Sequence, residues 1–284
     1  MTQTTCFAGH WESRIDRIAE GGTASGRGAG RAFAGVVALG FGASAAATVI
    51  GCGPMAGMRG MPMPGGWTMS MMWMRMPGQT WAGAGAWFTG MWVAMMAAMM
   101  LPSLAPVLWR YRQEVGKAGE RRADRRTALA ALGYFLVWAV AGMGVFAAGA
   151  AAAAIEMAEP GVARAVPMAG GLAVLMAGAV QFTRWKAHHL SCCREAPGRG
   201  RMAAVDGAAW RRGVELGMHC GLCCANLTVV LLVVGVMDLR AMAAVTAAIT
   251  AERLAPGAER VARAIGVVVA GAGVLWIAQA AGVR

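Results

Sequence analysis

Charged residues are scarce in this sequence. They make up 14% of its 284 residues, whereas hydrophobic residues make up 58%. Several apolar runs exceed the roughly 18 residues that mark a candidate transmembrane helix. The composition therefore predicts an all-α protein, a polytopic membrane helix bundle with about six transmembrane helices in a lipid bilayer.

The sequence also lacks the patterns of common catalytic sites. It has no Ser-His-Asp arrangement, no paired carboxylates and no phosphate-binding glycine loop, and its many glycines are typical of membrane helix packing. The net charge of +12 does not indicate nucleic acid, because the basic residues stand in short segments between apolar runs. We expect a protein that is not an enzyme and has no nucleic-acid partner.

The basic residues act instead as topology signals. The segments 110–126 and 184–212 each carry seven Lys and Arg, whereas 155–165 carries one. By the positive-inside rule the first two face the cytoplasm. This pattern predicts a multi-pass protein of the bacterial inner (cytoplasmic) membrane with both termini inside and residues 53–80 outside.

The apolar runs divide the chain into four expected parts. These are a disordered cytoplasmic tail (1–31), a weak first span (32–52), an outer segment rich in Met, Gly and Pro without a core-forming pattern (53–80), and a metal-binding membrane domain (81–284). Residues 239–254 are too short to cross comfortably and mix apolar with charged positions, which predicts a helix at the membrane interface.

Methionine is concentrated in the second expected span (about 86–108), which contains "MWVAMMAAMM" from Met91 to Met100. Met91, Met95 and Met99 stand four residues apart, and Met100 pairs with Met96, so each set shares a helical face. Such a stripe is compatible with plain packing, because methionine is a flexible apolar filler. It is also compatible with Cu(I) ligation, because thioether sulfur is a soft ligand.

Five of the seven cysteines and three of the four histidines fall in two short clusters. One cluster ends the fourth expected span (about 166–183) and the other begins the fifth (about 214–236), so antiparallel neighbours would bring them to the same depth. The candidate ligands are His188, His189, Cys192, Cys193, His219, Cys220, Cys223 and Cys224. Soft thiolates favour Cu(I) or zinc, and the C-x-x-C pair Cys220 and Cys223 also allows disulfide redox chemistry.

These motifs together resemble a family of bacterial predicted metal-binding integral membrane proteins, a domain of unknown function. Its typical elements are matched by Met99, Met100 and Pro102 in "AMMLP", by Lys186, Cys193, Arg194 and Pro197, and by Cys220, Cys223, Cys224, Gly235 and Met237. One branch of the family is associated with copper supply to a tyrosinase. The resemblance, which covers roughly 85–283, implies a copper chaperone.

The sequence thus predicts a membrane protein that binds Cu(I), with zinc as the second candidate, and passes it to an apoprotein such as a copper oxidase. The predicted ligands are the eight clustered Cys and His residues with Met95, Met99 and Met100. Two alternatives stay open. One is a thiol-disulfide or quinone-linked redox enzyme, and the other is a structural subunit of a membrane complex.

Overall fold

The computed structural model describes residues 24–57, 60–116, 120–194 and 206–282. Most of the predicted tail over 1–31 lies outside these ranges. The described elements are α1 (Ala24–Gly57), β1 (Met61–Met63), β2 (Trp67–Met69), η2 (Met71–Trp73), α2 (Trp81–Gly116), α3 (Glu120–Ala158), α4 (Pro160–Val180), α5 (Arg184–Arg194), α6 (Asp206–Val234), α7 (Leu239–Leu254) and α8 (Ala258–Ala280).

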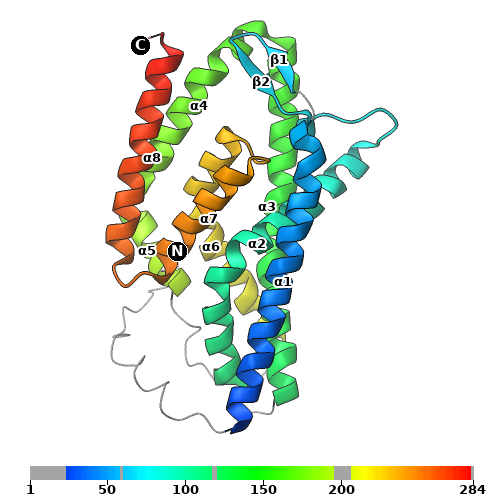
Figure 1. Cartoon of the computed structure of the whole chain (residues 1–284), viewed down its shortest axis with the longest axis vertical. Coiled ribbons are helices and arrows are strands. Elements are labelled where there is room, and N and C mark those ends of the chain that lie inside the picture. The colour runs from blue at the N-terminus through cyan, green and yellow to red at the C-terminus, as the bar shows by residue number, and fades with distance from the viewer. Residues whose placement is uncertain (1–23, 58–59, 117–119, 195–205, 283–284) are drawn as a thin grey trace.

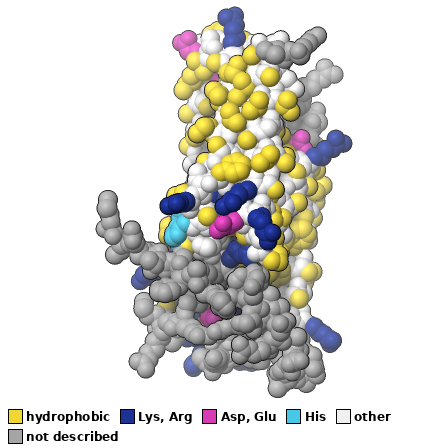
Figure 2. All heavy atoms as spheres, turned by 90° about the vertical axis from the view of Figure 1, so that its left-hand side faces the viewer, with side chains coloured by type: hydrophobic (Ala, Val, Ile, Leu, Met, Phe, Trp, Pro, Cys, Tyr) yellow, Lys and Arg dark blue, Asp and Glu magenta, His cyan; other side chains and the backbone are white. Residues whose placement is uncertain are grey.

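The long helices lie side by side in one bundle (Figure 1). Among the described residues, six helices are long and apolar enough to cross a membrane, namely α1, α2, α3, α4, α6 and α8. The predicted all-α fold with about six such helices is therefore confirmed. Figure 2 shows a broad band of hydrophobic side chains on the visible face, with charged side chains towards its two ends. A lipid bilayer requires such a band from a helical protein.

Glycine lets two helix pairs approach closely. Gly213 of α6 lies directly against the carbonyl of Ala130 in α3, so no side chain fits there. A Cβ at Gly178 of α4 would lie 2.5 Å from the backbone nitrogen of Ala270 in α8. Small residues bring membrane helices together in this way. On the α3–α6 pair, this contact sets Tyr134, one turn after Ala130, opposite Cys220.

The sequence predicted an interfacial helix over 239–254, but the position of α7 in the structure is different. It packs against α2, α5, α6 and α8 in the middle of the bundle (Figure 1). Its buried side chains are Met242, Val245, Ile249, Glu252 and Arg253. These positions follow helical spacing, so one face of α7 is buried although two of its side chains are charged. The interfacial prediction was wrong because tertiary partners for those charges exist inside the bundle.

The first and last described helices do not fit the prediction that both termini lie on one side. The start of α1 and the end of α8 lie at opposite ends of the bundle (Figure 1). The reason is α7, which returns the chain towards the α5 end before α8 begins there. We call this end, which carries the arginine-rich segments around 110–126 and 184–194, the arginine-rich end.

The Met-rich segment at the opposite end is folded rather than without a core. Its strands β1 and β2 pair antiparallel with Met61 opposite Met69. Met63 and Met69 are buried with Ala153 of α3 and Ala163 of α4. The indole Nε1 of Trp67 donates a hydrogen bond to the Ala163 carbonyl at 2.8 Å, which ties the hairpin to the start of α4. Methionine thus acts as packing in part of this segment.

Candidate metal centre

Four buried thiols from two helices meet in the bundle. We call Cys193, Cys220, Cys223 and Cys224 the thiol cluster, and each is at most 1% exposed. Helix α6 presents the last three on one face because they stand three and four residues apart. The Cys193 thiol of α5 is in side-chain hydrogen-bond contact with Cys220 and Cys223. The structure therefore brings together the two cysteine clusters that the sequence places on neighbouring helices.

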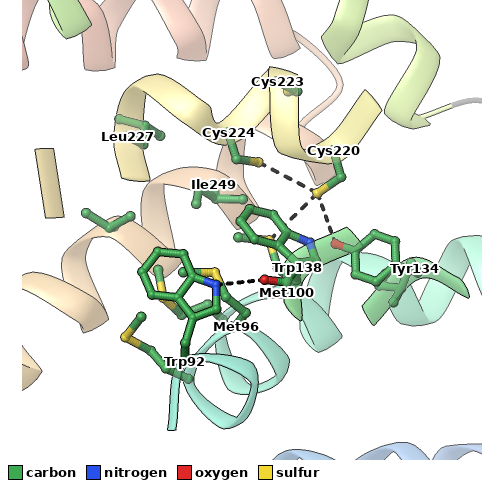
Figure 3. Packing of buried hydrophobic residues seen from close by; sticks show 14 of the residues in the cluster. Trp92, Met96, Met100, Tyr134, Trp138, Cys220, Cys223, Cys224, Leu227 and Ile249 are labelled. Atoms are coloured by element: carbon green, nitrogen blue, oxygen red, sulfur yellow. Dashed lines mark hydrogen bonds between the residues drawn. The ribbon is translucent and has the colours of Figure 1, made fainter. Parts of the chain in front are cut away.

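Methionine sulfur borders the thiol cluster on its α2 side. The Sδ of Met100 lies 3.8 Å from the Sγ of Cys220, and the Sγ of Cys224 lies 3.9 Å from the same atom. Figure 3 shows Cys220 and Cys224 pointing from α6 towards Met100 and Tyr134. Met95 and Met99 are each 2% exposed. The methionine stripe of α2 therefore faces the protein interior and not lipid.

Two hydrogen-bond donors point at Cys220. The hydroxyl of Tyr134 lies 3.0 Å from its Sγ, and Nη1 of Arg253 lies 3.3 Å from it. The same Nη1 donates to the hydroxyl of Ser103 at 2.9 Å. A sulfur that accepts from both a phenol and a guanidinium is stabilised in its anionic form, since charge-assisted hydrogen bonds are the stronger ones. The thiol cluster thus has a built-in preference for a thiolate at Cys220.

Among the described residues, no carboxylate pairs with Arg253 to balance its charge. It is 4% exposed, and its Nη2 has no partner among the described atoms. Within the described part of the chain, none of the ion pairs includes Arg253. An uncompensated buried charge is strongly unfavourable. The counter-charge available to Arg253 is on sulfur.

The neighbouring buried lysine is compensated. Nζ of Lys186 lies 2.7 Å from Oε2 of Glu252, and both side chains are 1% exposed. Nζ also donates to the carbonyl of Cys223 at 2.7 Å, while Gln181 donates to Oε1 of Glu252 at 2.7 Å. This network locks α5 and α7 onto the cysteine-bearing turn of α6. Glu252 therefore balances the positive charge of Lys186. The positive charge of Arg253 faces the thiol cluster instead.

The thiol cluster lies well inside the bundle. Cys220 and Tyr134 each follow the last arginine before them, Arg212 and Arg126, by eight residues. At a rise of about 1.5 Å per residue, both lie roughly 12 Å along their helices from these two arginines. Met100 precedes Arg110 by ten residues, or roughly 15 Å. Cys220, Tyr134 and Met100 thus lie at similar distances along their helices from these arginines.

The histidines form a neighbouring group. Nδ1 of His189 lies 3.2 Å from Nδ1 of His219, and the rings of His188 and His189 are in edge contact. Burial lowers the pKa of His189, as do the nearby His219 and His188, so its imidazole is neutral at neutral pH. Sγ of Cys192 lies 3.8 Å from Nε2 of His188. Whether these residues ligate a metal stays a prediction.

A family model described as PpoB2, copper chaperone, matches residues 89–276. The chain belongs to this family. No curated protein and no solved structure matches the chain. The PpoB2 match includes the methionine stripe, the thiol cluster and Arg253, whereas α1 and the β1–β2 hairpin lie outside it. Copper chaperones are not a class of enzymes.

Sequence reasoning named Lys186 of this PpoB2 chain as part of a family motif but missed Tyr134, Glu252 and Arg253, which also surround the thiols. The sequence does hold a signal for Glu252. Met242, Val245 and Ile249 follow helical spacing along one face of α7, and Glu252 comes three residues after Ile249, so it lies on that same face. Lys186 likewise shares a face with Leu190 and Cys193. No local signal marks Tyr134, because its role depends on the close approach of α3 and α6.

Proposed function

We propose that this protein is an integral protein of the bacterial cytoplasmic membrane that binds Cu(I) at the thiol cluster and delivers it to a copper-receiving apoprotein. The observation that carries the proposal is the group of four buried thiols with Met100 at its edge. The six apolar helices and the copper chaperone family support the same conclusion. The arginine-rich end would face the cytoplasm.

The ligand set favours Cu(I) over zinc. Structural zinc sites use four ligands in a tetrahedron. Within the described residues, no group of three or more His, Cys, Asp or Glu side chains is arranged to hold a metal ion. Cu(I) binds soft sulfur ligands and is satisfied by fewer of them. Cys220, with Cys224 at 3.9 Å and Met100 at 3.8 Å, offers such a set.

The charge of the surroundings also suits Cu(I). An ion with one positive charge and two thiolate ligands forms a complex with one net negative charge. Arg253, buried beside Cys220 without a carboxylate partner in the described chain, supplies the balancing positive charge. A complex of Zn²⁺ with four thiolates would carry two negative charges and leave one uncompensated. We therefore assign Arg253 as the counter-charge of the bound copper.

The methionine stripe provides a path through the bundle. Met95, Met99 and Met100 are buried and lead along α2 towards the opposite end. Thioethers bind Cu(I) without carrying charge of their own, so they suit transient ligands between two sites. In this view Met95, Met99 and Met100 hand copper over by ligand exchange, and the copper stays Cu(I) throughout.

Metal analysis of the full chain in detergent under reducing conditions tests the proposal. We expect tight Cu(I) binding in competition with a Cu(I) chelator, and the loss of one tightly bound ion per chain when Cys220, Cys223 and Cys224 are replaced by serine. Ala225→Ser is the matched control, because it adds one hydroxyl to an exposed position on the same helix. Unchanged copper stoichiometry and affinity in the triple variant would overturn the assignment. A reversible Cys220–Cys223 disulfide without copper binding would support the redox alternative instead.

A further inference from the structure

Helix α1 is peripheral, yet it buries a cysteine. Only 6% of its apolar window is buried, and its buried described side chains are Thr48 and Cys52. Thr48 satisfies its hydroxyl within α1 by donating to the Ser44 carbonyl at 2.8 Å. Cys52 is 1% exposed and belongs to the same buried cluster as the α2 methionines and the thiol cluster. Helix α1, and with it this thiol, lies outside the region that the family model matches.

The Cys52 thiol meets a thioether from a distant part of the chain. Its Sγ donates to Sδ of Met237 at 3.3 Å. Met237 lies in the turn between α6 and α7, which Gly235 makes possible with a φ of +133°. The turn directs Met237 into the bundle instead of continuing α6. A thiol and a thioether in contact place two soft ligands close enough together to bind the same metal ion.

A third sulfur residue borders this pair. A Cβ built on Gly51 would lie 3.8 Å from Cγ of Met91, so Met91 packs against α1 beside Cys52. Met91 begins the stripe that continues through Met95 and Met99 on the same face of α2. From Met91 to Met100 is nine residues, or roughly 13.5 Å along the helix. The stripe therefore joins the surroundings of Cys52 to the surroundings of Cys220.

We propose that Cys52 and Met237, with Met91, form a second Cu(I) site at the far end of the methionine stripe from the thiol cluster. This inference rests on the proposed function, since it assigns the place from which copper reaches the stripe. On binding, the Cys52 thiol releases its proton to water as the Cu–S bond forms. It takes a proton back when copper moves to Met91. The copper is neither oxidised nor reduced, and each ion leaves one sulfur ligand as it gains the next.

Counting bound ions in the full chain tests the second site. Ag(I), a redox-stable stand-in for Cu(I), is added in excess to the detergent-purified chain, and tightly retained silver is measured by mass spectrometry after desalting. We expect two ions in the wild type and one in Cys52→Ser/Met237→Leu. The matched control is Ala46→Ser/Met157→Leu, which introduces serine and leucine at exposed positions of α1 and α3 and should retain two ions.

The cysteine variant of the thiol cluster separates this proposal from the proposed function. Cys220→Ser/Cys223→Ser/Cys224→Ser should retain one ion, and X-ray absorption of that variant loaded with Cu(I) should show sulfur ligands only. This measurement leaves Cys52 intact, so it does not depend on the folding of a Cys52 variant. Two ions in Cys52→Ser/Met237→Leu, or none in the thiol-cluster variant, would overturn the second site and leave the proposed function standing. Two ions in the thiol-cluster variant would overturn the proposed function.

Discussion

Arg253 donates from Nη1 to Sγ of Cys220 across 3.3 Å, and both side chains are buried. The contact joins α7, a helix too short to count among the six apolar ones, to the centre of α6. A guanidinium that faces sulfur inside an apolar bundle is not explained by packing. It is explained by an anion at that place, which in our proposal is thiolate or copper-bound thiolate.

Replacing Arg253 by methionine should weaken Cu(I) binding. A hydrogen bond to a charged group is worth about 1.5–3 kcal/mol, which corresponds to about 10- to 100-fold in affinity. Arg253→Lys keeps the charge and should recover part of the loss. Competition with a Cu(I) chelator measures the affinities, and Arg240→Met is the control at an exposed position of the same helix. Equal affinities of the methionine and lysine variants would contradict the role of charge.

Tyr134→Phe should lower Cu(I) affinity by about 2- to 10-fold, because it removes the hydroxyl that donates to Cys220 at 3.0 Å and keeps the ring. Tyr111→Phe is a matched control, since the Tyr111 hydroxyl is buried without a partner among the described atoms. That variant should bind copper like the wild type and be no less stable. Two indistinguishable variants in the same competition assay would argue against the hydrogen bond.

The triple variant Met95→Leu/Met99→Leu/Met100→Leu should fold but fail in copper delivery. These swaps nearly conserve volume and usually cost under about 1.5 kcal/mol each. The readout is copper delivery or copper tolerance of cells at matched protein abundance. Leucine at the exposed Met143, Met157 and Met176 is the control set. Wild-type delivery by the buried triple variant would assign the stripe to packing alone.

Lys186→Met should destabilise the protein by about 3–5 kcal/mol, since it leaves the buried Glu252 carboxylate without its partner. Adding Glu252→Met should restore much of the stability, because neither charge is then buried. Thermal unfolding in detergent compares the variants. Glu259→Gln is the control, as its pair with Arg263 is exposed and should matter little. A Lys186→Met midpoint equal to that of the wild type would show that the pair is not structural.

Reporters at the two chain ends should lie on opposite sides of the membrane. Helix α7 returns the chain to the arginine-rich end before α8, so α8 ends at the far side (Figure 1). A phosphatase active only outside the cytoplasm, fused after Arg284, should be active, and the same fusion before Met1 should be inactive. Both fusions use the full chain with α7 intact. Two inactive fusions would restore the arrangement with both ends in the cytoplasm.

Much of the architecture follows from local chemistry. Apolar runs such as 128–154 cannot leave their backbone groups unpaired in lipid, so they form helices wherever they pack. The spacing of Cys220, Cys223 and Cys224 puts them on one helical face in any helical structure. The meeting of the two cysteine clusters was accessible as well, since consecutive antiparallel helices bring their linked ends together.

By itself, then, the sequence determined the helix class, the number of long apolar helices, the clustering of sulfur and the family resemblance, because each depends on residues close in the chain. Tertiary structure alone decided that α7 lies inside the bundle, that Arg253 faces Cys220, and that Cys52 meets Met237. The reason is physical. A charged residue is buried only where a partner from another helix compensates it, and contacts across 33 or 185 residues leave no periodic trace in the sequence.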